Sequence, residues 1–99
     1  MRRGNTRNRR VRRRFWIEGR VQMVGFRAFA TIHARRLGLQ GWVRNTESGA
    51  VEVLAEGPSA SVEEFARQLR RGPVAAHVTA VSSFEETVKP GLTDFGPAP

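Results

Sequence analysis

The segment EGRVQMVGFR (residues 18–27) combines residue types that suit anion binding but contains no group that could attack a bound anion. Its two glycines allow a tight turn in which several main-chain N–H groups point at one spot. Arg27 follows where a helix is expected to begin, and its guanidinium can donate two parallel hydrogen bonds to a phosphate. No Ser, Thr, Cys, His or Asp lies in the segment. It indicates a phosphate-binding loop without a nucleophile; an ordinary strand-to-helix turn with a surface arginine is the alternative.

Direct attack by water is the chemistry that such a loop supports. Without a nucleophile, the protein would act by binding and orienting the reactants and by neutralising charge. Because the loop also lacks an obvious general acid, the leaving group has to depart unprotonated, which favours a carboxylate, with a pKa of about 4, over an alkoxide. The residue types therefore point to a mixed anhydride of a carboxylic and a phosphoric acid. We expect Glu18, the acid nearest the loop, to face away from a bound phosphate.

The elements that position this loop follow the order strand, helix, strand, strand, helix, strand. Aromatic, β-branched and alternating apolar residues predict strands over 14–19, 39–45, 50–57 and 77–86. Apolar residues three and four apart predict helices over 26–37 and from Ser59 or Ser61 to Gly72. A short edge strand is expected near Asp94-Phe95. This order predicts an α+β, ferredoxin-like βαββαβ sandwich: an antiparallel sheet with both helices on one face.

The net charge of +8 is concentrated at one end of the sequence. The first fourteen residues hold eight arginines and no acid, while the remaining nine basic residues are balanced by all nine acidic ones. We expect a disordered arm over 1–13, a neutral folded domain over 14–96 and a flexible tail over 97–99. The arm either binds nucleic acid or other polyanions non-specifically or is a solvated extension without a partner.

Composition excludes several kinds of site. The chain has no cysteine, which rules out disulfides, thiolate chemistry and cysteine-based zinc sites, and its two histidines are too few for a histidine-rich metal site. It contains no apolar run long enough to cross a bilayer and no signal-peptide core. We expect a cytoplasmic protein that binds no membrane, metal or cofactor.

Two longer segments, IEGRVQMVGFR (17–27) and GWVRNTESGAVEVLAEG (41–57), resemble the signature segments of the acylphosphatase family. The resemblance extends over nearly the whole chain from about Phe15. It implies a ferredoxin-like fold and the hydrolysis of a small-molecule acyl phosphate to a carboxylate and inorganic phosphate, without metal or cofactor. Small stand-alone monomers are typical of the family, and we expect one here.

The resemblance also implies roles for individual residues. Arg27 would bind the phosphoryl group, and Asn45 would position the attacking water through its side-chain amide, although Asn45 alone would be interpreted as a turn residue. Main-chain N–H groups of one loop would hold the phosphate; its residues are Arg20, Val21, Gln22, Met23, Val24 and Gly25. The family usually has glycine where this chain has Met23. If that position requires a positive φ, methionine costs on the order of 1–2 kcal/mol there.

An RNA- or DNA-binding module of the same fold, helped by the arginine-rich arm, is the main alternative. An RNA-recognition domain would carry aromatic residues on its third strand, whereas AVEVLAE (50–56) has none. Trp16 and Trp42 are interpreted as sheet-packing aromatics rather than base-stacking platforms. An acylphosphatase-like domain of a larger maturation enzyme is less favoured, because nothing follows Pro99 in the sequence. We therefore predict an acylphosphatase.

Overall fold

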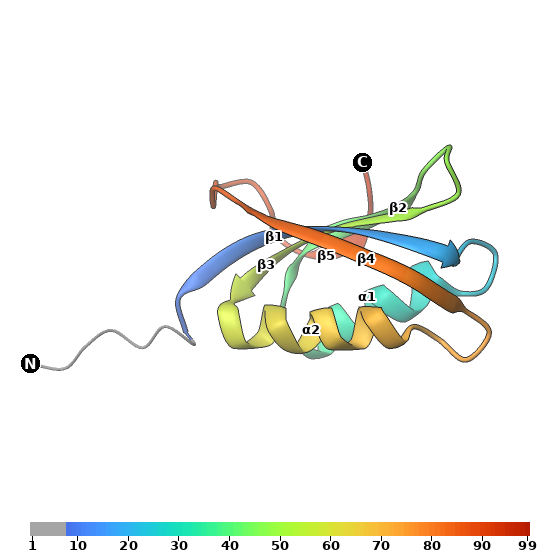
Figure 1. Ribbon diagram of the computed structural model, residues 1–99. Coiled ribbons are helices and arrows are strands. Elements are labelled where there is room, and N and C mark those ends of the chain that lie inside the picture. Colours follow the sequence, from blue (N-terminus) through green and yellow to red (C-terminus); the bar gives the residue numbers. More distant parts are fainter. Residues whose placement is uncertain (1–7) are drawn as a thin grey trace, which may run out of the picture.

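In the computed structural model, which describes residues 8–99, two helices cover one face of a five-stranded sheet (Figure 1). The strands are β1 (Arg10–Arg20), β2 (Gln40–Asn45), β3 (Val51–Pro58), β4 (His77–Glu86) and β5 (Phe95–Pro97). The helices are α1 (Phe26–Arg36) and α2 (Ser59–Arg71). The strand order β4-β1-β3-β2-β5 places β1 and β3 side by side in the sheet. The predicted α+β, ferredoxin-like architecture is confirmed.

The edge strand β5 departs from the antiparallel pattern that the other strands follow. It runs parallel to β2, with Pro97 opposite Val43, and the Ala98 N–H donates to the Val43 carbonyl at 3.0 Å. Proline is tolerated at the edge of a sheet because the missing N–H leaves no ladder bond unmade. The prediction of a flexible tail over 97–99 is therefore wrong for Pro97 and Ala98, and the sheet is mixed.

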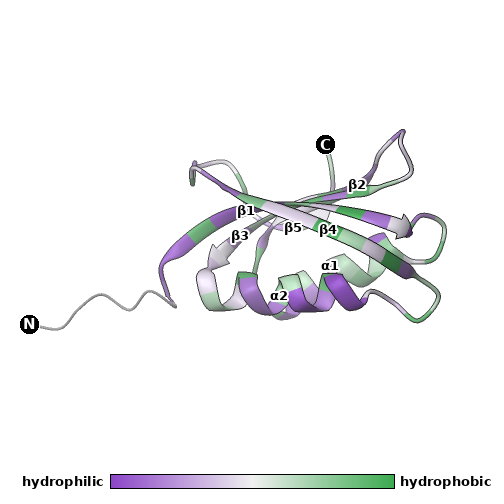
Figure 2. Ribbon diagram, viewed as in Figure 1, coloured by the Kyte–Doolittle hydropathy of each residue, from purple (hydrophilic) through white to green (hydrophobic). Residues whose placement is uncertain are grey.

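The core lies between the sheet and the helices. Hydrophilic and hydrophobic residues alternate along β1 (Figure 2). Phe15 and Ile17 lie on the face of the strand that packs against the helices, and both are fully buried. Phe15 meets Phe65 of α2 edge-on, with ring centroids 6.2 Å apart. On α1, Phe26 and Ala30 are buried at the spacing that the sequence predicts. This packing fixes the end of β1 and the start of α1, the two elements that flank the predicted loop.

The strand β1 begins at Arg10 rather than at Arg14. Arg12 is only 8% exposed, and its Nε donates to Glu56 Oε1 of β3 at 2.7 Å. The Arg10 Nε donates to the other oxygen of the same carboxylate at 3.0 Å. The predicted disordered arm over 1–13 is therefore wrong for residues 10–13, because carboxylates of the neighbouring strand offset their charge. Arg9, also in the predicted arm, is placed as well, since its carbonyl accepts a hydrogen bond from the Ser59 N–H at 2.8 Å. Residues 1–7 of that prediction lie outside the described residues.

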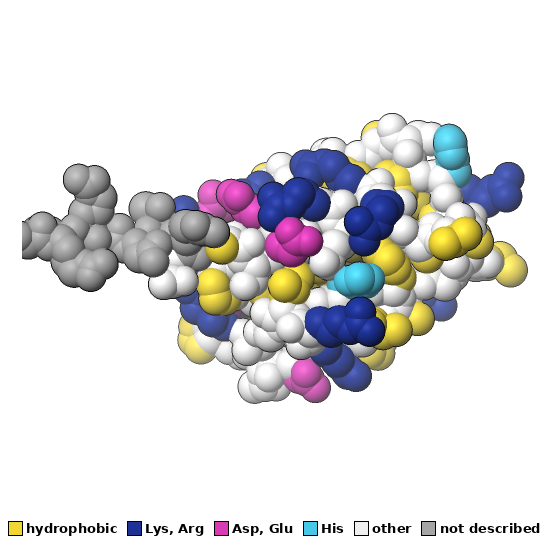
Figure 3. Space-filling model, turned by 90° about the horizontal axis from the view of Figure 1, so that it is seen from below, with side chains coloured by type: hydrophobic (Ala, Val, Ile, Leu, Met, Phe, Trp, Pro, Cys, Tyr) yellow, Lys and Arg dark blue, Asp and Glu magenta, His cyan; other side chains and the backbone are white. Residues whose placement is uncertain are grey.

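The positive charge of the molecule is thus not confined to an arm. The described residues hold all but three of the 17 basic residues together with all nine acidic ones, so the prediction of a neutral folded domain is wrong. Both helices end in basic turns, with Arg35 and Arg36 on α1 and Arg70 and Arg71 on α2. Figure 3 shows basic side chains distributed over this helical face.

Within residues 8–99, no helix combines the length and the apolar character needed to span a membrane.

Candidate active site

The loop that follows β1 leads directly into the N-terminus of α1. Gly25 is the N-cap residue, with a φ of 82°, and its carbonyl accepts a hydrogen bond from the Phe29 N–H at 3.0 Å. The first turn of α1 contains no acidic residue. The free N–H groups and the positive end of the helix dipole therefore face a site without a local negative charge, which suits an anion.

Met23 lies in the middle of this loop in the left-handed conformation. Its φ is 63°, and no other non-glycine residue of the described range has a positive φ. Its side chain is 99% exposed, so packing does not stabilise this conformation. The loop thus keeps the tight path that a glycine would follow most easily, at a cost on the order of 1 kcal/mol.

Gln22 ties the loop to the turn between β2 and β3. Its side-chain Nε2 donates to the carbonyls of Thr46 and Ala50, at 2.8 Å each. The turn itself is closed by the Thr46 N–H, which donates to the Ala50 carbonyl at 2.9 Å. In Figure 1 the loop and the turn lie at the same end of the molecule. Through Gln22, the loop is held next to Asn45, the last residue of β2.

A pocket of about 190 Å³ lies where the loop, the start of α1 and the end of β2 meet. Its lining residues come from all three segments and are Val21, Met23, Gly25, Phe26, Arg27, Ala28 and Asn45. The fold therefore brings Arg27 and Asn45, which belong to separate sequence motifs, to one pocket. Sequence reasoning did not assign Phe26 and Ala28 to this site; their position beside Arg27 was the available signal.

The two polar side chains of this pocket, Arg27 and Asn45, have no partner in the described part of the chain. Arg27 is exposed and Asn45 half-buried, and neither side chain forms a hydrogen bond or ion pair within residues 8–99. Arg12, Arg14 and Arg44 differ, since each pairs with a glutamate of β3. The charge of Arg27 is therefore available to a ligand.

The other predicted loop residues have different surroundings. The Arg20 side chain is exposed and Val24 packs against the hydrophobic core. Neither of them lines the pocket, and Gln22 does not line it either. For these three residues the predicted contribution rests on main-chain N–H groups alone. Glu18 is also absent from the lining of the pocket.

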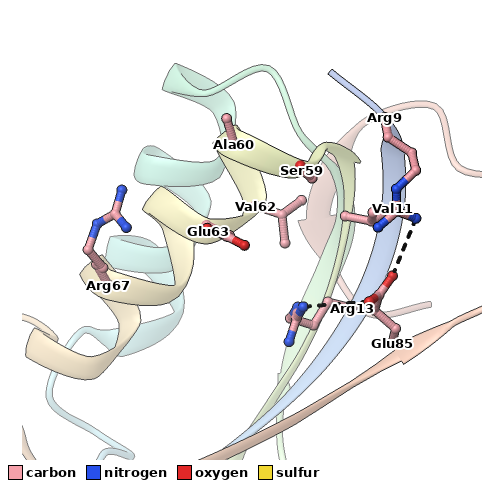
Figure 4. A pocket seen from close by; sticks show the side chains of 9 residues that line it. All are labelled: Arg9, Val11, Arg13, Ser59, Ala60, Val62, Glu63, Arg67 and Glu85. Carbon is pink, nitrogen blue, oxygen red and sulfur yellow. Dashed lines mark ion pairs between the residues drawn. The ribbon is translucent and has the colours of Figure 1, made fainter. Parts of the chain in front are cut away.

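A larger cavity, of about 540 Å³, lies near the other end of β1, beside the start of α2. Arg9 and Arg13 both point toward Glu85 there (Figure 4), with nitrogen–oxygen distances of 3.9 Å. The arginines and the glutamate of this cavity thus face one another, and the cavity shares no residue with the pocket at Arg27.

Within the described part of the chain, no three His, Cys, Asp or Glu side chains are grouped so that they could hold a metal ion.

Comparison with known proteins identifies the family of this chain. The Acylphosphatase family model matches residues 13–97. This chain belongs to the acylphosphatase family. A curated acylphosphatase of Rhodopseudomonas palustris (strain BisB18) is 44% identical over 82 residues, which cover 83% of this chain and 78% of that protein.

Two solved structures extend the comparison with acylphosphatases. The crystal structure of acylphosphatase from Bacillus subtilis has a TM-score of 0.86 at 36% identity, covering 89% of this chain and 98% of that one. Full-length HypF, in its phosphate- and nucleotide-bound form, has a TM-score of 0.84 at 30% identity. That match covers 92% of this chain but 12% of HypF. The same fold therefore also forms part of a much longer protein.

Proposed function

We propose that this acylphosphatase hydrolyses acyl phosphates by direct attack of water on phosphorus in the pocket at Arg27. The observation that carries the proposal is the lining of that pocket. A helix N-terminus meets an arginine and a side-chain amide in one hollow, and neither side chain has a partner among the described residues. These are the groups that a phosphate and a bound water molecule need.

Binding of the phosphoryl group is the first step. Main-chain N–H groups of the loop from Arg20 to Gly25 donate to its oxygens, and the Arg27 guanidinium adds a bidentate charge-assisted pair. Because Arg27 gives up no ion pair within residues 8–99 on binding, its full electrostatic attraction is available to the dianionic phosphate. The positive charge also stabilises the charge that develops on the phosphoryl oxygens in the transition state.

Water is the nucleophile in the second step. The Asn45 amide orients it in line with the bond between phosphorus and the acyl oxygen; a neutral amide is no base, so its role is positioning. The water oxygen forms a bond to phosphorus, and the phosphorus–acyl oxygen bond breaks with its electron pair on the carboxylate. The phosphate oxygens accept the proton that the water loses. No metal, cofactor or covalent intermediate on the protein takes part.

The open face of the sheet favours this enzyme over the nucleic-acid-binding alternative. Glu52 and Glu56 of β3 lie in the row of residues turned away from the helices. They form ion pairs with the arginines of this face, Arg10, Arg12, Arg14 and Arg44, so these guanidinium groups are not free to contact a phosphate backbone. The Trp42 ring is covered by the Arg14 guanidinium, 5.4 Å from its centroid. A base would have to displace that arginine in order to stack on it.

The proposal is tested by incubating the purified protein with benzoyl phosphate in ¹⁸O-labelled water and a chelator. We expect hydrolysis that inorganic phosphate inhibits competitively, with the label in the phosphate product. Label in the benzoate would mean attack on the carbonyl carbon and would refute direct attack on phosphorus. Loss of turnover in the chelator, restored by a divalent cation, would refute the metal-free mechanism.

A further inference from the structure

We infer that an apolar groove beside the phosphate pocket binds the acyl group of the substrate, so that the preferred acyl phosphates carry an uncharged, apolar acyl group. This inference rests on the proposed function, because it assigns the second half of the same substrate. The groove has a volume of about 390 Å³. Its lining residues come from α1, β2 and β5 and are Arg27, Ala28, Thr31, Ile32, Val43 and Pro97.

The groove and the phosphate pocket are neighbours that share two residues. Arg27 and Ala28 line both hollows, so a ligand whose phosphate lies at Arg27 is already at one end of the groove. Val43 and Asn45 are two residues apart on β2 and point to the same face, about 7 Å from each other. Ile32 follows Ala28 by about one turn of α1, about 6 Å along the axis.

These spacings match the size of an acyl group. The carbonyl carbon of an acyl phosphate is separated from phosphorus by a single oxygen atom, so the rest of the acyl chain begins near the edge of the phosphate pocket. A ring or a short branched chain then extends over a distance comparable to one helical turn. It would reach Ile32 and Val43, whereas the methyl group of an acetyl phosphate would stop short of them.

The chemistry of the groove favours an apolar ligand. Ile32 is 50% exposed, so covering it removes apolar surface from water. The Thr31 hydroxyl donates to the Arg27 carbonyl at 2.9 Å and offers no free proton. Arg27 is the only charged residue among the described residues that line the groove, so a cationic acyl group meets no carboxylate of that lining. A second carboxylate on the acyl group would compete with the phosphate for Arg27.

The outer wall of the groove is held in place without a ligand. Pro97 lies opposite Val43 in the parallel pair of β5 and β2. Hydrogen bonds flank it on both sides: the Ala98 N–H donates to the Val43 carbonyl at 3.0 Å, and the Gly41 N–H donates to the Asp94 carbonyl at 2.9 Å. A wall that is already formed costs little ordering entropy when the acyl group binds.

The binding test compares benzylphosphonate with methylphosphonate as competitive inhibitors, since neither can be hydrolysed. We expect the ring to lower the inhibition constant about tenfold in the unchanged protein, and Ile32→Ser to remove most of that gain. Val88→Ser is the matched control, because Val88 is similarly exposed, at 39%, and does not line the groove. Equal inhibition by the two phosphonates would overturn the inference. The groove would then bind something other than the acyl group, such as a partner protein.

The turnover test compares kcat/KM for benzoyl, acetyl and succinyl phosphate. For each pair of substrates, we take the ratio of their kcat/KM values in Ile32→Ser and divide it by the same ratio in the unchanged protein. This division cancels the intrinsic reactivity of the substrates. We expect the benzoyl-to-acetyl ratio to fall about threefold to tenfold, mainly through KM, and the succinyl-to-acetyl ratio to stay unchanged. If all three substrates are hydrolysed but the ratios do not move, the inference fails and the proposed function stands. If none is hydrolysed, the proposed function itself fails.

Discussion

Met23 occupies the strained backbone position of the loop that we propose binds phosphate. With a φ of 63° and a side chain that is 99% exposed, it has the conformation of a glycine and none of the packing that usually compensates for it. The sequence predicted that a positive φ would be costly at this residue, but the backbone was needed to show that the loop keeps the tight path. We therefore expect the main-chain N–H groups around Met23 to be arranged as in a loop with glycine at this position.

Replacing Met23 by glycine tests this interpretation. We expect Met23→Gly to raise the free energy of unfolding by roughly 0.5–1 kcal/mol, because relief of strain outweighs the added freedom of the unfolded chain. Turnover should stay the same or rise. Urea unfolding and an acyl phosphate assay measure both, and Met23→Ala, which removes the side chain and keeps the strain, is the control. A sharp loss of activity in Met23→Gly alone would show that this backbone strain is part of the working site.

Gln22 connects the loop element to the hairpin element. Its amide spans from the loop to two carbonyls of the β2–β3 turn, so the positions of Arg27 and Asn45 depend on one side chain between them. The sequence placed Gln22 in the loop but gave it only a main-chain role, because hydrophobic periodicity says nothing about which turn a polar side chain will reach.

We expect Gln22→Ala to leave both elements folded but less firmly joined. The free energy of unfolding should fall by about 1–2 kcal/mol, because two carbonyls lose a donor, and the KM for the acyl phosphate should rise. Gln40→Ala is the control: the Gln40 side chain also forms a hydrogen bond between two strands, in which it accepts from Arg10, and it does not line the pocket at Arg27. If both variants keep the KM of the unchanged protein, the tie at Gln22 does not position the loop.

The elements themselves were largely predictable from the sequence. The spacing of Phe26, Ala30 and Ala34 identified α1, and the alternation of Phe15 with Ile17 identified the buried face of β1. The missed parts depend on partners distant in the sequence. Arg10 and Arg12 resemble an unstructured basic arm until Glu56 is placed beside them, and Pro97 resembles the end of the fold until β2 supplies its neighbour.

At the scale of the whole molecule, the basic N-terminal sequence divides into two parts with different expected roles. Residues 10–13 complete β1: Val11 is buried in the core, and Arg12 is nearly buried against Glu56. Glu56 is 4% exposed in the intact fold, and without Arg12 it would lose its closest cation. A buried carboxylate without its partner destabilises a fold strongly.

Two truncations separate these parts. Deleting residues 2–7 should change the free energy of unfolding and the hydrolysis rate little, while weakening retention on a polyanion such as heparin in a salt-dependent way. Deleting residues 2–13 should lower the free energy of unfolding by about 3 kcal/mol or more, because it removes Val11 and leaves Glu56 unpaired. Urea unfolding distinguishes the two, and equal stability of both truncations would contradict the structural role of residues 10–13.

The central claim is that Arg27 holds the phosphoryl group while Asn45 acts only on the attacking water. Measuring both phosphate affinity and kcat in Arg27→Ala and Asn45→Ala, with Arg20→Ala as the control for loss of a nearby surface charge, tests it most directly. We expect Arg27→Ala to lose phosphate binding and turnover. Asn45→Ala should bind phosphate normally with kcat lower by about a hundredfold or more, and Arg20→Ala should change neither. Normal turnover in Asn45→Ala, or normal phosphate affinity in Arg27→Ala, would contradict the account.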